Sequence, residues 1–67
     1  MFTIQLNGAD REIADDATVA DLLAELGVDP RHVAVERNLE LAPRTAHAQT
    51  RLASGDRIEI VTLVGGG

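Results

Sequence analysis

Residues 2–8 read FTIQLNG, and the rest of the fold can be worked out from this segment. Apolar residues alternate with polar ones here, at Phe2, Ile4 and Leu6. This period of two predicts a strand with one buried face. Asn7 and Gly8 follow directly, and both residue types accept the positive φ of a two-residue hairpin turn. We therefore expect a hairpin whose return strand covers about residues 9–14, with Ile13 facing inward.

The next segment has the spacing of one amphipathic helix. Its apolar residues recur at i, i+3, i+4 and i+7 and form one stripe: Val19, Leu22, Leu23 and Leu26. Thr18 and Asp21 have the spacing of a capping box at the N-terminal end. Gly27 is a natural C-terminal stop, and Pro30 prevents the helix from resuming. This helix is the main one that the sequence predicts.

The remaining predicted elements are short. We expect strands at 33–35 and 41–42, one helical turn within 45–52, a turn at 54–56, and a final strand over about 57–63. In that final strand Ile58 and Ile60 share one face, whereas Glu59, Val61 and Leu63 share the other.

One amphipathic helix across a mixed sheet makes two layers around a single core. A final strand beside the N-terminal strand would complete the β-grasp, or ubiquitin-like, arrangement. We therefore predict an α+β fold, a mixed sheet packed on one main helix. It is expected as a single domain over residues 1–67, with a flexible glycine tail at 64–67.

Composition argues against several function classes. The chain has 67 residues, no cysteine and a formal net charge of −5. Without cysteine it has no disulfide, no zinc–thiolate site and no thiol chemistry of its own. The acidic balance argues against a nucleic-acid partner and suits docking to a basic protein surface. No signal peptide and no apolar run of membrane-spanning length is visible, so we expect a cytoplasmic protein without a membrane partner.

Conventional catalytic groups are sparse. His32 and His47 are isolated in the sequence, so we predict surface or capping roles for them and no metal site. Ser54 lacks the strand–turn–helix context of a nucleophile elbow. No bound cofactor is expected.

The C-terminal segment carries more chemistry. Val64 is followed by Gly65, Gly66 and Gly67 directly after the final predicted strand. Such a tail can be a mere flexible end. Alternatively, glycines without Cβ atoms let the terminus enter a narrow channel. The Gly67 carboxylate would then be open to a nucleotide phosphate or a sulfur nucleophile.

The last strand offers a candidate docking surface. Val61 and Leu63 lie on the sheet face that no second helix covers, and Val64 follows them. Exposed apolar residues just before the tail would aim the glycines into a partner's active site. The alternative is that they are ordinary exposed residues of a strand.

Several pieces, taken in order, identify a family. They are residues 2–8, 19–23, 33–38, 43–44, 55–61 and 64–67. Over essentially its whole length the chain resembles the ThiS family of bacterial sulfur carriers in the thiamine pathway. Two positions depart from the family pattern: His47 stands where a tryptophan is common, and Leu39 where a glycine is common. Because leucine is unfavourable at positive φ, we expect no tight type I′ turn after Asn38.

The resemblance implies a mechanism in which the chain is a protein co-substrate and not an enzyme. A ubiquitin-activating-like adenylyltransferase would use ATP and magnesium to adenylate the Gly67 carboxylate. A persulfide sulfur from a donor protein would then displace AMP and leave a thiocarboxylate. Thiazole synthase would take that sulfur into the thiazole ring of thiamine. Gly65 and Gly66 would supply flexible access.

Four alternatives remain open from the sequence. Two are other carriers, namely the small subunit of molybdopterin synthase and an amino-acid-pathway sulfur carrier. The third is a ubiquitin-like modifier conjugated to target lysines. The fourth is a passive β-grasp interaction domain whose glycines do not react.

Overall fold

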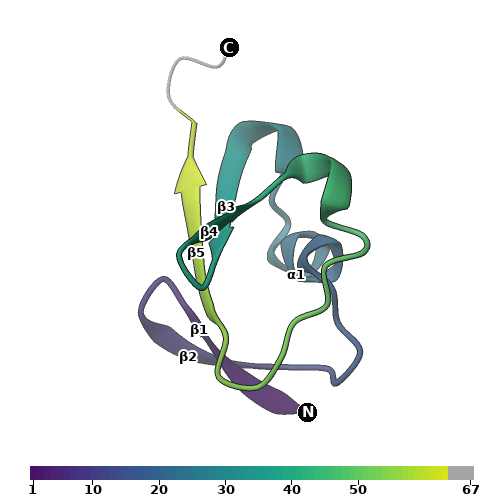
Figure 1. The fold of residues 1–67 in the computed structure, drawn as a ribbon, viewed down its shortest axis with the longest axis vertical. Helices are drawn as coiled ribbons and strands as arrows, with labels where there is room; N and C mark the ends of the chain where they lie inside the picture. The colour runs from purple at the N-terminus through teal and green to yellow at the C-terminus, as the bar shows by residue number, and fades with distance from the viewer. Residues whose placement is uncertain (64–67) are drawn as a thin grey trace.

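The computed structural model describes residues 1–63, which form a mixed five-stranded sheet with one α-helix across one face (Figure 1). The strands are β1 (Phe2–Leu6), β2 (Ala9–Ile13), β3 (Val33–Arg37), β4 (Glu40–Ala42) and β5 (Arg57–Thr62). The helix is α1 (Val19–Leu26), and two 3₁₀ turns are η1 (Pro30–His32) and η2 (Arg44–Ala46). The order of strands is β2-β1-β5-β3-β4.

The pairing of the two terminal strands decides the topology. β5 lies in the middle of the sheet, parallel to β1 and antiparallel to β3. Both outer pairs, β1–β2 and β3–β4, are antiparallel. The predicted α+β architecture, with the final strand beside the first, is therefore confirmed. The predicted tail at 64–67 lies outside the described residues.

The first hairpin forms where the sequence predicts it. Asn7 and Gly8 have φ of 49° and 84°, and Leu6 pairs with Ala9 across the turn. The return strand ends at Ile13, which is buried as expected.

Helix α1 begins and ends at the predicted residues. The amide of Asp21 donates to Thr18 Oγ1 at 3.2 Å, and the amide of Thr18 donates to Asp21 Oδ2 at 2.9 Å. This is the predicted capping box. Gly27 ends the helix in the left-handed conformation, with φ of 70°.

The core lies between α1 and the sheet. Val19, Leu22 and Leu23 of the predicted stripe are buried, and Leu26 is partly buried at its end. They pack among buried residues from the other elements: Ile4, Ile13, Ala17, Val35, Ala42, Leu52 and Ile58. No helix among residues 1–63 is long and apolar enough to cross a membrane.

The turn between β3 and β4 corrects one prediction. Arg37 pairs with Glu40, so Asn38 and Leu39 alone make the turn, with φ of 53° and 71°. The expectation that Leu39 prevents a tight turn with positive φ was wrong. Hydrogen bonds of Asn38 to the start of β5 hold the turn, and Leu39 points into solvent with 74% of its surface exposed. The tertiary contacts thus outweigh the local cost of a left-handed leucine, about 1–2 kcal/mol.

Candidate functional site

The strand that leads to the predicted reactive terminus is anchored at its start by a buried carboxylate. Asp56 is only 6% exposed. Its Oδ2 accepts from Arg37 Nε and from the Ala53 amide, both at 2.8 Å, and its Oδ1 accepts from Asn38 Nδ2 at 3.0 Å. Asn38 in turn accepts from the amide of Arg57 at 2.9 Å. This Asp56 cluster therefore joins the β3–β4 turn to the first residue of β5.

The same contacts set the charge state of the carboxyl group. Burial of Asp56 opposes ionisation, but hydrogen bonds from Asn38, Arg37 and the Ala53 amide outweigh it. The pKa of the Asp56 carboxyl is consequently lower than its ordinary value. Asp56 is an ionised structural anchor for β5.

A second anchor lies on the other side of β5. The amide of Asn7 donates to the carbonyl of Ile58 at 2.9 Å. The Asn7 side chain continues along the strand, because its Oδ1 accepts from the Ile60 amide at 2.8 Å and its Nδ2 donates to the Ile60 carbonyl at 3.3 Å. The side-chain amide thus takes the place of the next peptide group of β1, just where the main chain turns away.

The sheet face opposite α1 is apolar toward the end of β5. Val61 and Leu63 are 56% and 49% exposed, whereas Ile58 on the helix side is fully buried. The predicted division of β5 into two faces is therefore confirmed. Leu41 of β4 is also exposed. It pairs with Glu36 of β3, which pairs in turn with Glu59 of β5, so Leu41 lies on the same sheet face as Glu59.

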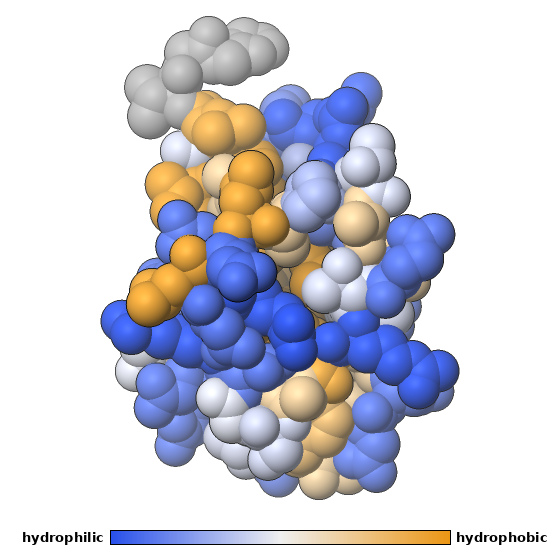
Figure 2. All heavy atoms as spheres, viewed as in Figure 1, coloured by the Kyte–Doolittle hydropathy of each residue, from blue (hydrophilic) through white to orange (hydrophobic). Residues whose placement is uncertain are grey.

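Figure 2 shows orange hydrophobic residues gathered along one side of the molecule. We call the exposed pair Val61 and Leu63 the β5 patch. Its role in binding a partner stays a prediction. The other predicted site residues, Val64, Gly65, Gly66 and Gly67, lie outside the described part of the chain.

His47 lies in a different place from the one predicted. Its side chain is only 5% exposed, so the expected surface role was wrong. His47 does stand at the C-cap of η2, where its amide donates to the Arg44 carbonyl at 3.2 Å. Ring Nε2 lies 3.0 Å from the carbonyl oxygen of Ala42, which can only accept, so Nε2 carries the proton. Ring Nδ1 is buried without a hydrogen-bond partner among the described residues. His47 thus ties the segment after β4 to the end of that strand.

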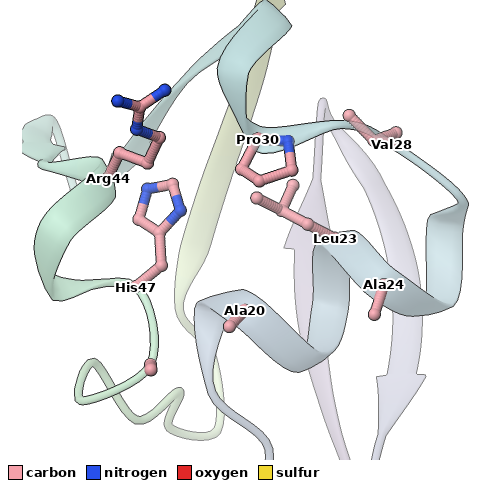
Figure 3. A pocket seen from close by; sticks show the side chains of 8 residues that line it. Ala20, Leu23, Ala24, Val28, Pro30, Arg44 and His47 are labelled. Atoms are coloured by element: carbon pink, nitrogen blue, oxygen red, sulfur yellow. The ribbon is translucent and has the colours of Figure 1, made fainter.

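An apolar hollow of about 320 Å³ lies beside the His47 ring, between α1 and η2. Figure 3 shows the ring facing Leu23 and Pro30 across this hollow, with Arg44 next to it. The ring and the apolar side chains around it thus leave a hollow at this point of the surface.

The other histidine and the acidic residues form no metal centre in the described structure. His32 is exposed, and its contribution to β5 is its carbonyl oxygen, which accepts from the Leu63 amide at 2.9 Å. No group of three or more possible metal ligands comes together within residues 1–63.

Sequence reasoning missed both anchors of β5. The Asp56 cluster joins residues 18 and 19 positions apart, and the contacts of Asn7 with Ile60 join residues 53 positions apart. Local patterns carry no signal over such separations. A weak signal was available, since Arg37, Asn38 and Asp56 all lie in the pieces that matched the family pattern.

Comparison with known proteins identifies the family. A family model described as the ThiS family matches residues 4–67. The chain belongs to the ThiS family. This confirms the resemblance drawn from the sequence, and with it the assignment to the sulfur carriers, which are not enzymes.

Two relatives show how ThiS sequences occur. The sulfur carrier protein ThiS of Bacillus subtilis is 42% identical over 96% of this chain and 98% of its own length. A thiazole synthase of Paramagnetospirillum magneticum is 52% identical over 92% of this chain. The chain spans only 19% of the length of that second relative. A ThiS-like stretch is therefore part of a thiazole synthase in that organism.

A solved structure supports the fold. The thiamine biosynthesis protein ThiS of Geobacter metallireducens is 32% identical, with a TM-score of 0.86. The match covers 98% of this chain and 100% of that one.

Proposed function

We propose that this ThiS-family protein carries sulfur as a thiocarboxylate on Gly67 and delivers it to thiazole formation in thiamine biosynthesis. The observation that carries the proposal is the family match, which runs through residue 67 and so includes the three terminal glycines. The nearly full-length similarity to the Bacillus subtilis sulfur carrier supports it.

The proposed chemistry begins with activation, because a carboxylate is a poor electrophile. A Gly67 carboxylate oxygen attacks the α-phosphorus of ATP, and pyrophosphate leaves. The partner adenylyltransferase holds ATP and magnesium. A persulfide of the donor protein then attacks the acyl carbon, and AMP leaves with the C–O bond electrons. A second thiol cleaves the resulting acyl disulfide, which leaves the thiocarboxylate on Gly67. Because this activation consumes ATP, we also propose a cytoplasmic location.

The role proposed for the described residues is presentation of the terminus. The Asp56 cluster and Asn7 hold β5 on both sides, so the strand gives the tail a fixed origin. The β5 patch supplies an apolar surface two to four residues before Gly65, which an activating or acceptor enzyme would cover. Gly65 and Gly66 lack side chains that would block entry into a narrow active site, and Val64 joins them to the patch.

Thiazole synthase is the acceptor that we propose. Its support is the Paramagnetospirillum magneticum relative, a thiazole synthase that contains a stretch similar to this chain. In that relative the carrier-like stretch and the thiazole synthase are made as one polypeptide. This fits successive roles of a carrier and a thiazole synthase in one reaction sequence.

Adenylation can be tested by exchange of labelled pyrophosphate into ATP with the adenylyltransferase of the same organism. We expect exchange that depends on the carrier, because the acyl-adenylate forms reversibly. Deletion of Gly67 should abolish it, whereas the control change Gln5→Ala, at an exposed position of β1, leaves the terminus intact. Equal exchange with the deleted chain would contradict the assignment.

A further inference from the structure

The peptide groups of β5 alternate between its two neighbours. Leu63 donates to the carbonyl of His32 at 2.9 Å, and Arg57 accepts from the amide of Asn38 at 2.8 Å, so the odd-numbered residues of β5 bond toward β3. In an antiparallel pair the residues between them point the other way. The contacts of Ile58 and Ile60 with Asn7 confirm this direction.

Thr62 therefore points its N–H and C=O toward the side of β1, but β1 does not reach it. The pairing of β1 with β5 covers two positions, Gln5 with Arg57 and Leu6 with Ile58. The Asn7 side chain extends this to Ile60. Among residues 1–63 no strand lies beside Thr62 on this side, so the N–H and the C=O of Thr62 both face an open edge.

An apolar groove lies next to this open edge. Its volume is about 360 Å³. The residues that line it are Leu6, Asn7, Leu26, Val28, Val33, Ile60 and Thr62. Because Ile60 and Thr62 direct their side chains to the helix side of the sheet, the groove lies on the face opposite the β5 patch.

We propose that an extended segment of a partner protein adds as a short strand to the edge of β5 at Thr62. A donor and an acceptor on one strand residue are matched by another strand, whose peptide groups have the same spacing. A side chain of that strand would enter the groove, whose lining selects an aliphatic residue. With a net charge of −5 on this chain, the flanking residues of the partner are basic and a second copy of this chain is disfavoured.

This edge site is separate from the proposed chemistry of Gly67 and from the β5 patch. A partner could cover the patch on one face while its extended segment pairs along the edge. Failure of adenylation would overturn the proposed function but leave the edge site untouched. Failure of strand addition at Thr62 would overturn the edge site but leave the proposed chemistry of Gly67 untouched.

The test uses the folded chain and a capped peptide of sequence KTVTVTK as the probe. In titrations followed by ¹⁵N–¹H NMR, we expect the largest shifts at Thr62, Asn7, Ile60 and Val28. Thr62→Pro removes the N–H donor of Thr62 at the open edge. It keeps the hydrogen bonds to β3, because these come from the odd-numbered residues on either side of Thr62. It should weaken binding at least about tenfold relative to Thr62→Ala, which keeps the donor.

Two further measurements complete the design. Equal thermal midpoints for the two Thr62 variants would show that the fold is kept. If Thr62→Pro unfolds, the parent chain is instead titrated with a probe whose peptide groups are N-methylated. That methylated probe should not bind, since it cannot pair as a strand. Equal binding of both probes, shifts confined to the β4 edge at Glu40–Ala42, dimerisation through Thr62, or no shift at low-millimolar probe would overturn the proposal.

Discussion

The two ends of β5 differ in how many neighbours they have. At its start, Arg57 and Ile58 pair with β1 on one side and β3 on the other, and the Asp56 cluster fixes the approach. At its end, Val61 and Leu63 lie beside β3 alone among the described elements and are about half exposed. The strand is thus held in the core at its start and accessible at its end, which suits the presentation of Gly67 that we propose.

The largest expected effect comes from truncating one apolar residue at each end of β5. Ile58→Ala should destabilise the fold by about 2–5 kcal/mol, because a fully buried side chain is lost. The matched change Val61→Ala should cost less than about 0.5 kcal/mol, since that side chain faces solvent. Urea unfolding followed by circular dichroism measures both. Similar losses for the two variants would refute the difference between the ends.

The Asp56 cluster gives the next largest effect. Asp56→Asn should cost about 1–3 kcal/mol, because it weakens charge-assisted hydrogen bonds in a buried site. Asn38→Ala tests the same cluster from the turn. Urea unfolding of both variants at neutral pH measures the loss. A stability equal to that of the parent chain would show that Asp56 does not anchor β5.

The lowered pKa of Asp56 also predicts a pH dependence. Since its folded pKa lies below the unfolded value, the carboxylate contributes stability that is present above the unfolded pKa. That contribution is lost as the pH falls through the folded pKa. The parent chain should therefore lose more stability than Asp56→Asn between neutral pH and about pH 3. Parallel pH profiles of the two chains would contradict this.

Charges on the β5 patch should affect binding and not folding. Val61→Asp and Leu63→Asp should weaken binding to the adenylyltransferase and to thiazole synthase about tenfold each, because a carboxylate is buried at the contact. Gln5→Asp is the matched control, since it adds the same charge to an exposed position on the same sheet face. Titration calorimetry with thermal melts decides between the outcomes. If the patch variants bind like the control, the patch is not the shared interface.

The smallest expected effect concerns the strained turn. Leu39→Gly should stabilise the fold by about 0.5–1 kcal/mol, since glycine accepts the φ of 71° without a Cβ clash. The gain is limited because glycine also gives the unfolded chain more freedom. Thermal melts measure it, and a destabilised variant would show that the leucine makes a contact worth more than its strain.

How much of this could be predicted from sequence depends on the range of each interaction. The hairpin at Asn7, the capping box at Thr18 and the stripe of α1 follow local rules, and the structure places all three as expected. The alternation along β5 also predicted correctly that Val61 and Leu63 are exposed. These features depend on neighbours within about one turn of helix or two strand positions.

The errors arose where distant contacts overrule local preference. Leu39 adopts a conformation that leucine avoids because Asn38 is held by β5, and His47 is buried by packing between α1 and the segment after β4. The open edge at Thr62 depends on where β1 ends relative to β5, which requires the register of the two strands. The hypothesis that Gly67 reacts came from the glycine tail together with the family resemblance.

The most direct test of the central claim is the intact mass of the chain after reaction. Incubation with ATP, the adenylyltransferase, a persulfide donor and a thiol that cleaves the acyl disulfide should add about 16 mass units, the difference between sulfur and oxygen in the terminal group. Fragmentation should place the gain on Gly67. Addition of thiazole synthase with its substrates should return the original mass. An unchanged mass in the presence of active enzymes, or a gain placed elsewhere in the chain, would contradict the account.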